Sequence, residues 1–234
     1  MVKCDKSPVA PASLKVEKLK GENGSYRGED VVEQLKTDFH DKCYICELKG
    51  LQDPEIEHLV PHKGNLDLKF DWDNLFWSCG HCNSIKNQRK YDGKIINCCQ
   101  EDPELHIQFL YTDDNIDVKP LDDHEETQMT AQLVDEVFNL RNTGMRVIKS
   151  AQRMKALQRE MNIFFNELKR YQENKSETNK RRVVVRLKRS AAFAAFKRSY
   201  ITEIKMNMPN FKNMWHCKIE RINHFVYKNH HRRL

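Results

Sequence analysis

Apolar residues recur every three or four positions along several stretches of the chain, which is the spacing that places them on one face of a helix. The longest such stripe breaks near residues 142–144, where Asn, Thr and Gly interrupt it. A second stripe stops before Pro209, because proline cannot continue a helix. The pattern predicts helices over residues 29–40, 127–171, 183–208 and 211–227.

Short apolar and alternating runs predict strands in the first half of the chain. Residues 56–60 form such a run between Pro54 and Pro61, and residues 64–71 read as a loop. Residues 105–111 alternate, residues 112–115 are rich in turn formers, and residues 116–118 return as a hairpin. A helix is expected to start at Cys82.

These elements predict an α+β fold in which a small module precedes a mainly helical extension. We expect three parts. Residues 1–27, with two prolines and two glycines among polar residues, read as an extended or loosely ordered arm. Residues 28–125 form the small module, and residues 126–234 form a helical, basic region.

Charge is divided unevenly between the two halves of the chain. Residues 1–150 contain 19 Lys and Arg against 28 Asp and Glu, whereas residues 151–234 contain 21 against 6. A basic block of this kind attracts polyanions and is typical of proteins that bind nucleic acid. It also fits a solvated helical surface or a docking face for an acidic protein partner, and the charge balance does not choose between them.

The chain contains eight cysteines and no apolar run near the roughly 20 residues that a membrane-spanning helix needs. The first residues lack the apolar core of a signal peptide. We therefore expect a cytoplasmic protein without a membrane partner, in which cysteines bind metal more readily than they form disulfides. Cys98 and Cys99 are adjacent and have no second pair nearby, so we interpret them as ordinary thiols.

Four cysteines form two Cys-x-x-Cys pairs that 32 residues separate. A two-residue gap allows both thiolates of a pair to face one ion, and two such pairs complete a tetrahedral site. The spacing predicts one structural zinc ion that contributes much of the folding free energy of the module. The expected ligands are Cys43, Cys46, Cys79 and Cys82.

Polar residues between and just after these pairs suggest chemistry beyond a structural metal. His58 carries an imidazole that can accept a proton from water near neutral pH. Glu57 and Asn83 offer oxygen ligands to a hard divalent ion such as Mg²⁺. On a strand Glu57 and His58 face opposite sides, so a shared site requires a bend or a twisted strand end. The alternative is a non-catalytic zinc ribbon with ordinary polar caps.

The block from Cys43 to Lys86 resembles the HNH endonucleases, whose ββα-metal fold surrounds the catalytic site with a hairpin and a helix. The family pattern of Cys-x-x-Cys, acidic residue-His, Asn, and Cys-x-x-Cys-His/Asn followed by Lys is matched throughout, with Asn83 where many members have a second histidine. The resemblance implies that His58 is the general base, while Glu57 and Asn83 hold Mg²⁺ or Mn²⁺. It further implies that Asn74 orients the loop that carries His58 and that Lys86 braces the site or contacts phosphate.

A narrower resemblance extends from residues 56–63 through residues 70–83. These segments are similar to the PtuB nucleases of Septu anti-phage defence systems, and residues 101–109 and 193–200 are similar more loosely. Such bacterial nucleases work with an ATPase called PtuA, and some of these pairs accompany retrons. The resemblance therefore implies a PtuA-like ATPase as a partner, and it extends to a retron reverse transcriptase with its RNA or DNA.

Additional candidates for substrate contact are Glu55, His62 and His81.

Three functions are compatible with the sequence. The favoured one is a nuclease that cuts nucleic acid, with DNA preferred over RNA as substrate. The second is a treble-clef zinc module that binds nucleic acid or a protein partner without cutting. Such a module has no need for Glu57-His58 and Asn83-x-x-Lys86 in register, which argues against it. The third is a structural subunit with a degenerate nuclease site, against which the intact motif residues argue.

Overall fold

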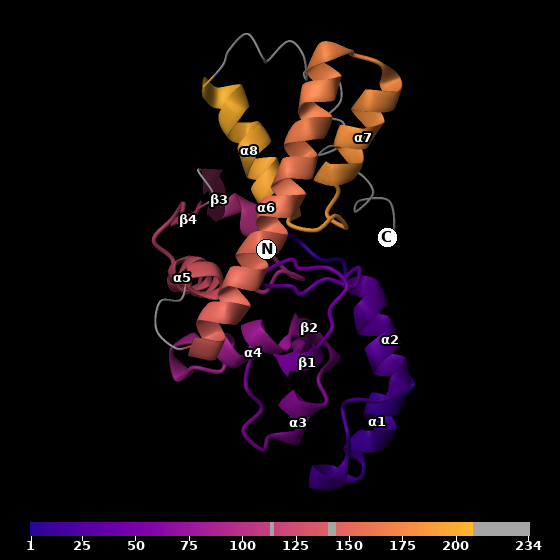
Figure 1. Cartoon of the computed structure of the whole chain (residues 1–234). Coiled ribbons are helices and arrows are strands. Elements are labelled where there is room, and N and C mark those ends of the chain that lie inside the picture. The colour runs from indigo at the N-terminus through magenta and orange to yellow at the C-terminus, as the bar shows by residue number, and fades with distance from the viewer. Residues whose placement is uncertain (113–114, 140–143, 208–234) are drawn as a thin grey trace.

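A computed structural model describes residues 1–112, 115–139 and 144–207. The molecule is α+β, as the sequence predicts, with small antiparallel hairpins and a helical extension (Figure 1). The strands are β1 (Pro54–His58), β2 (Leu75–Cys79), β3 (Ile107–Thr112) and β4 (Asn115–Pro120), and the helices are α1 (Ala12–Lys18), α2 (Glu29–Asp38), α3 (Leu66–Lys69), α4 (Gly80–Lys86), α5 (Glu125–Asn139), α6 (Gly144–Glu173), α7 (Glu177–Leu187) and α8 (Ala194–Asn207).

The motif block, residues 43–86, is built on the β1–β2 hairpin and helix α4. The two strands pair antiparallel, with Glu57 opposite Phe76 and His58 opposite Leu75. Helix α4 follows β2 without a connecting residue. Every residue of β2 is buried, because this strand lies between the hairpin partner and the helices. The predicted strand and helix are confirmed, although β1 starts two residues earlier than the pattern indicates and α4 starts at Gly80 instead of Cys82.

Part of the predicted loop at residues 64–71 is the short helix α3. Asn65 precedes this helix, and its side-chain oxygen accepts hydrogen bonds from the backbone N–H groups of Asp67 at 2.8 Å and Leu68 at 3.3 Å. An asparagine in this position satisfies N–H groups that have no partner within the helix. The expectation of a loop was wrong because a single capped turn is too short to show helical periodicity.

The predicted second hairpin is confirmed as β3 and β4, which pair antiparallel from Ile107 with Pro120 to Thr112 with Asn115. Residues 113–114 of the expected turn lie outside the described residues. Helix α5 packs on β4, and α8 packs on β3. The hairpin is therefore held between helices from two different parts of the chain.

The first 27 residues are not an extended arm over their whole length. They contain α1, and the side chains of Met1 and Val2 are buried. The Met1 amino group lies 3.0 Å from the carboxylate of Glu47, and both are almost fully buried. The indole N–H of Trp72 also donates to the carbonyl of Ser7 at 2.9 Å. Glycine and proline content predicts local looseness, but these long-range contacts order the segment.

The extension contains a break that the periodicity does not show. The single helix predicted over residues 183–208 is wrong, because α7 ends at Leu187 and α8 begins at Ala194. Phe193 has a φ of 50°, in the left-handed region. The backbone N–H groups of Ala194 and Ala195 donate to the Glu47 carboxylate at 2.9 and 3.2 Å. A negative charge at a helix N-terminus is stabilising, so a distant residue fixes where α8 starts.

Other expectations for the extension can be compared only in part. The long predicted stripe is divided into α5 and α6, and residues 140–143 between them lie outside the described residues. Residues 174–176 connect α6 to α7. The last predicted helix, over residues 211–227, lies outside the described residues. Within the described residues, no helix has both the length and the apolar character needed to cross a membrane.

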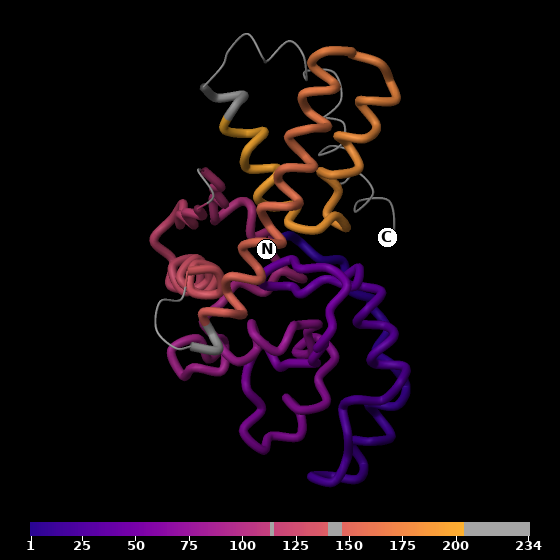
Figure 2. The backbone as a smooth tube through the Cα atoms, viewed as in Figure 1, coloured from indigo at the N-terminus to yellow at the C-terminus, as the bar shows by residue number. Residues whose placement is uncertain are grey.

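A continuous set of buried apolar side chains joins the N-terminal segment, the motif block and the extension. The backbone trace shows the long helix α6 running from the motif block to the far end of the molecule, where α7 and α8 flank it (Figure 2). The division at residues 27 and 125 remains a prediction about separate units. In the structure the extension packs directly against the module.

Candidate functional site

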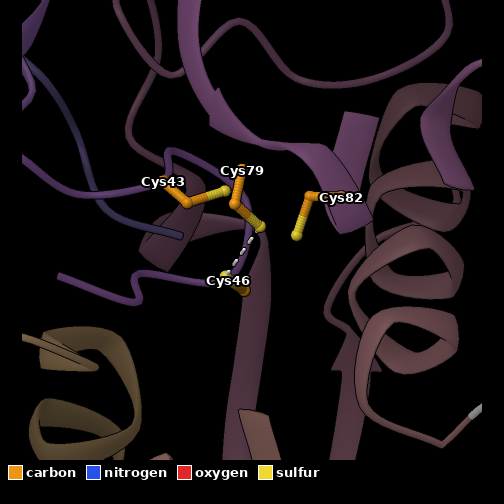
Figure 3. A group of neighbouring side chains, drawn as sticks. All are labelled: Cys43, Cys46, Cys79 and Cys82. Atoms are coloured by element: carbon orange, nitrogen blue, oxygen red, sulfur yellow. Dashed lines mark hydrogen bonds between the residues drawn. The ribbon is translucent and has the colours of Figure 1, made fainter. Parts of the chain in front are cut away.

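Four cysteine side chains converge between the first Cys-x-x-Cys turn and the junction of β2 with α4 (Figure 3). All four Sγ atoms lie within 4.8 Å of one another, and all four residues are buried. Zinc bound by four thiolates at about 2.3 Å requires a tetrahedral group of sulfurs of this size. The donor set therefore fits the structural zinc ion that the spacing predicts. The four residues that could hold it are Cys43, Cys46, Cys79 and Cys82.

Backbone hydrogen bonds shape the first Cys-x-x-Cys turn before any metal is considered. The N–H of Glu47 donates to the carbonyl of Cys43 at 2.9 Å, and the N–H of Cys43 donates to the carbonyl of Leu48 at 3.0 Å. Tyr44 N–H donates to the carbonyl of Trp77 on β2 at 3.0 Å. The turn is thus attached to the strand that ends in Cys79, so the two cysteine pairs are positioned by the same hairpin.

Helix α6 contributes a cation to this cysteine cluster. Nη2 of Arg153 donates to the Sγ of Cys79 at 3.0 Å, and Nη1 donates to the carbonyl of Lys149 at 3.0 Å. Arg153 is only 5% exposed. Its positive charge offsets part of the net negative charge that four thiolates and one Zn²⁺ would carry. Sequence reasoning did not identify this residue, because it lies 71 residues beyond Cys82.

His58, at the end of β1, has one ring nitrogen fixed by a backbone hydrogen bond. Its Nε2 lies 3.0 Å from the carbonyl oxygen of Lys69, which only accepts, so Nε2 carries the proton. Among the described residues, Nδ1 has no hydrogen-bond partner. The rings of Tyr26 and His62 both contact the ring of His58, with centroids 4.6 and 4.7 Å from its centroid. Partial burial is the main cause that lowers the pKa of His58, which favours the neutral ring.

Asn74 holds the segment that follows His58. Its Oδ1 accepts from the N–H of Val60 at 2.8 Å, and its Nδ2 donates to the carbonyls of Val60 at 2.9 Å and Leu68 at 3.1 Å. The backbone carbonyl of Asn74 also accepts from Leu59 N–H at 2.9 Å. One side chain therefore ties both ends of the loop that carries the Lys69 partner of His58.

Glu57 points away from His58 and toward helix α4. Its Oε1 accepts a short hydrogen bond from the hydroxyl of Tyr44 and lies 3.8 Å from Nζ of Lys86. Its Oε2 is buried and has no hydrogen-bond partner among the described residues. Burial raises the pKa of Glu57 to about 7, against the opposing effect of Lys86. An unpaired buried carboxylate oxygen is an available ligand for a divalent cation.

Lys86 connects the two faces of β1. Its Nζ donates to the carbonyl of His58 at 2.8 Å while it approaches Glu57 from α4. Lys86 is 2% exposed, and both of these contacts are to residues of β1. Of the two roles that the resemblance implies for this residue, the observed contacts match bracing.

Asn83, in the first turn of α4, is paired with the carboxylate of Glu55, which the sequence indicates only as an additional candidate. Its Nδ2 donates to Oε2 of Glu55 through a short hydrogen bond. Glu55 and Glu57 lie two residues apart on β1, so both side chains face α4. The oxygen of the Asn83 amide is left for another partner. Glu55, Glu57 and Asn83 are therefore brought together between β1 and α4, while His58 lies on the other face.

The two additional histidines differ in position. His81 is 1% exposed, and its Nε2 lies 3.0 Å from the carbonyl of Val137 and 3.3 Å from Oγ of Ser150. It joins α4 to α5 and α6 and does not face the site. His62 lies beside His58, and its Nδ1 accepts from the N–H of Gly64 at 3.2 Å. Of these two histidines, only His62 remains a candidate for substrate contact.

Sequence reasoning missed two tyrosines that contact the motif residues. Tyr44 lies inside the first Cys-x-x-Cys pair, at a position that the zinc pattern leaves open. Tyr26 comes from the N-terminal segment, and no local signal connects it to His58. Among the described residues, the four-cysteine cluster is the one group of three or more His, Cys, Asp or Glu side chains close enough to share a metal ion. Cys98 and Cys99 do not belong to it.

Comparison with known families adds one result. The family model for HNH endonucleases matches residues 43–89, a segment that contains all four cysteines and each of the five motif residues from Glu57 to Lys86. No curated protein matches the chain. The family match and the four-cysteine cluster together fit an HNH zinc module at residues 43–89.

Proposed function

We propose that this protein is a metal-dependent endonuclease that hydrolyses phosphodiester bonds in nucleic acid, with DNA as its preferred substrate. The observation that carries the proposal is the position of His58. Its Nε2–H donates to a backbone carbonyl, so the ring orientation is fixed and the lone pair of Nδ1 points in one direction. A general base needs such a free and oriented nitrogen.

In the proposed reaction, Nδ1 of His58 removes a proton from a water molecule. The water oxygen forms a bond to phosphorus, the bond between phosphorus and the 3′ oxygen breaks, and the 3′ oxygen takes a proton from solvent water. The products would carry 5′-phosphate and 3′-hydroxyl ends. The carbonyl of Lys69 stabilises the positive charge that His58 acquires, because the Nε2–H bond is retained throughout.

Glu57 and Asn83 would hold one Mg²⁺ or Mn²⁺ ion in this proposal. Because their side chains lie on the opposite face of β1 from His58, the reaction requires a twist of the strand end that brings the ion and His58 to the same phosphate. The residues fit such an ion, because Oε2 of Glu57 is buried without a partner and Asn83 donates only through its nitrogen. Mg²⁺ commonly takes one or two protein ligands and completes its shell with water and phosphate oxygens. When bound, the ion would stabilise negative charge on the phosphate and on the leaving oxygen.

The remaining residues position these groups. Asn74 fixes the loop that supplies the Lys69 carbonyl, and Lys86 holds the backbone of His58. Tyr26 and His62 contact the imidazole ring, with centroids 4.6 and 4.7 Å from it. None of these contacts moves a proton. Each limits the orientations that His58 can adopt, which is the contribution that a preorganised site makes to catalysis.

The test is a cleavage assay with duplex DNA, single-stranded DNA and RNA, each with Mg²⁺, Mn²⁺ or EDTA. The wild-type protein and the His58→Ala variant are compared, with His124→Ala as the control. His124 is exposed and lies outside the motif block. We expect loss of cleavage by at least 100-fold in His58→Ala, no loss in His124→Ala, and no cleavage in EDTA. Equal cleavage by His58→Ala and wild type would exclude His58 as the base.

We further propose that the nuclease acts in the bacterial cytoplasm as the effector of an anti-phage defence complex with an ATPase. The support for this step is the resemblance of residues 56–83 to PtuB nucleases. The same resemblance extends the proposal to a retron reverse transcriptase with its nucleic acid as a third component. Co-purification of the full chain from its native operon, followed by mass spectrometry, tests the idea. Recovery of an ABC-type ATPase supports it, and recovery of the chain alone contradicts it.

One observation favours a second candidate function, a zinc module that binds without cutting. Glu57 is 3% exposed and already interacts with Tyr44 and Lys86, as a purely structural residue would. The same assay separates the two functions, because divalent-ion-dependent nicking by the wild-type protein excludes the binding module. The unpaired Oε2 of Glu57 is the reason for preferring the nuclease.

A further inference from the structure

Two surface hollows of opposite charge flank the motif block. The first, of about 650 Å³, lies beside Asn74 and contains four carboxylates. The second, of about 540 Å³, lies where the first Cys-x-x-Cys turn meets α6 and α7. It contains four cations, Lys49, Arg159, Arg186 and Lys188, and a single carboxylate from Glu160. Only the second hollow suits an anion.

We propose that this second hollow, the basic hollow, binds the phosphate backbone of a nucleic acid at a place separate from His58. No residue that lines it belongs to the predicted catalytic set. The inference rests on the proposed function for the identity of the polyanion. Its physical basis is the arrangement of charge at this surface, which is independent of cleavage.

The positive charge of the basic hollow is largely uncompensated. Among the ion pairs of the described residues, none involves Arg159 or Lys188, and both side chains are exposed. The carboxylate of Glu160 lies 2.7 Å from Nζ of Lys197 and 3.6 Å from the guanidinium of Arg186. The buried ammonium group of Lys197 already pairs with this carboxylate. The Glu160 charge therefore neutralises little of the positive charge of the four cations that line the hollow.

The cations continue beyond the hollow along both helices. Lys155 precedes Arg159 by four residues on α6, and Arg182 precedes Arg186 by four residues on α7. Residues at this spacing lie on the same side of a helix, about 6 Å apart along its axis. Lys155 and Arg182 are exposed. The two helices pack against each other, so the charges form a track that a linear polyanion can follow.

Arginine is frequent in this track, and its planar guanidinium group binds phosphate oxygens through two parallel hydrogen bonds. An acidic peptide would also be attracted to these cations, but its carboxylates do not repeat at a fixed spacing along the backbone as the phosphates of a nucleic acid do. The linear arrangement therefore favours nucleic acid over a protein partner as the occupant.

The wall of the hollow is attached to the turn that carries Cys43 and Cys46. Nζ of Lys49 donates to the carbonyl of Ser190 at 3.2 Å, and Nζ of Lys42 donates to the carbonyl of Ala191 at 3.0 Å. The connection between α7 and α8 is thus fixed to the module and not only to the helices. A strand bound in the basic hollow would be held in a defined orientation relative to the catalytic domain.

The experiment measures binding of a fluorescent 30-base-pair DNA duplex and a 30-nucleotide single strand by anisotropy, over a series of salt concentrations. The full chain carries His58→Ala in every sample and no Mg²⁺ or Mn²⁺ is added, so that cleavage does not interfere even if His58 is not the base. The test variant is Arg159→Gln with Lys188→Gln. The control is Lys169→Gln with Lys175→Gln, which replaces two exposed cations that do not line the hollow.

We expect the test variant to bind at least one of these probes about 10-fold or more weakly. The slope of log K against log salt should become shallower by about 1.4–1.8, because each phosphate contact contributes about 0.7–0.9. The control variant should keep the affinity and slope of its parent. Thermal unfolding of each variant checks that the fold is retained, and Lys188→Gln alone, expected to lose about half of the slope change, provides a milder substitution.

Unchanged affinity and slope for both probes would overturn the inference, as would equal weakening in the control variant. Tighter binding of a poly-glutamate peptide than of either nucleic acid, lost in the test variant, would assign the hollow to an acidic protein and also overturn it. Because binding is measured in a cleavage-deficient chain, the outcome is separate from the proposed function. A protein that never cuts can still show the predicted loss of binding.

Discussion

Arg153 of helix α6 donates a hydrogen bond of 3.0 Å to the Sγ of Cys79, which is one of the four cysteines in the metal-binding cluster. The two residues are 74 positions apart in the sequence. Through this contact the helical extension becomes part of the metal centre. A change in α6 can therefore reach the hairpin that carries Glu57 and His58.

The first prediction concerns this contact. Arg153→Met keeps the length and apolar stem of the side chain but removes its charge and hydrogen bonds. We expect weaker zinc retention and a lower unfolding temperature, because a charge-assisted hydrogen bond to a buried thiolate is lost. Metal content after dialysis against a chelator and calorimetric unfolding measure the two effects. Gln152→Met, at an exposed neighbouring position, is the control. Equal behaviour of both variants would show that the contact is unimportant.

The second prediction concerns metal removal. We expect about one zinc ion per chain, and we expect a strong chelator to abolish the cooperative unfolding of the module, because metal binding and folding are coupled at such sites. Cys79→Ser should lose the ion, whereas Cys99→Ser, outside the cluster, should retain it. Elemental analysis and near-ultraviolet circular dichroism provide the measurements. A chelated protein that unfolds as cooperatively as the loaded one contradicts the expectation.

A third prediction follows from the hydrogen bonds of Asn74. Asn74→Ala removes all three side-chain bonds and leaves the N–H of Val60 without its acceptor, which should cost about 1–3 kcal/mol of unfolding free energy. Asn74→Asp keeps the acceptor for the N–H of Val60 and loses the two donated hydrogen bonds. The free energy of unfolding of Asn74→Asp should therefore differ from that of Asn74→Ala. Urea unfolding gives the stabilities, and cleavage is measured on the same preparations. Full cleavage activity of Asn74→Ala would show that the loop held by Asn74 is not needed to position His58.

Tyr26 provides a fourth prediction, because its ring contacts His58 edge-on with centroids 4.6 Å apart. Tyr26→Phe retains the ring, and we expect nearly normal cleavage. Tyr26→Ala should lower kcat more than it changes KM, since the imidazole loses orientation without losing a substrate contact. Steady-state cleavage kinetics distinguish these results. Equal losses in Phe and Ala would instead assign the effect to the hydroxyl group.

The fifth prediction uses Glu104, whose Oε1 accepts from Nε of Arg198 at 2.7 Å while its Oε2 is buried without a partner among the described residues. Burial raises the pKa of Glu104 to about 7; Asp102 and Glu47 add to this, and Arg198 and the Met1 amino group oppose it. The folded-state pKa lies above the unfolded value. The contribution to stability is therefore greatest at low pH and is lost as pH rises from about 4.5 to 7.

Replacing Glu104 by Gln removes this titration. We expect the difference in unfolding free energy between Glu104→Gln and wild type to grow by up to about 3 kcal/mol, in favour of the variant, between pH 4 and pH 8. Urea unfolding across this range measures it. Glu22→Gln, at an exposed position, should show a constant difference. A constant difference for Glu104→Gln as well would contradict the raised pKa.

The sequence by itself determined the parts of the site that depend on short spacing. Two Cys-x-x-Cys pairs specify a four-sulfur cluster because each pair fits one turn, and the cluster forms as expected. Strand alternation placed Glu57 and His58 on opposite faces, as their separate contacts show. Helical periodicity located α2, α5 and α6 because amphipathic helices of this length repeat their apolar residues often enough to be read.

Only the tertiary structure decided which distant groups complete the site. Tyr26 comes from a segment whose glycines and prolines suggest disorder, and Arg153 comes from a helix whose periodicity identifies only its apolar face. The break before α8 depends on a carboxylate from Glu47, nearly 150 residues earlier in the chain. Local spacing carries no information about such contacts, because they exist only after packing brings separate elements together. For the same reason, the basic hollow is visible only where α6 and α7 meet the first Cys-x-x-Cys turn.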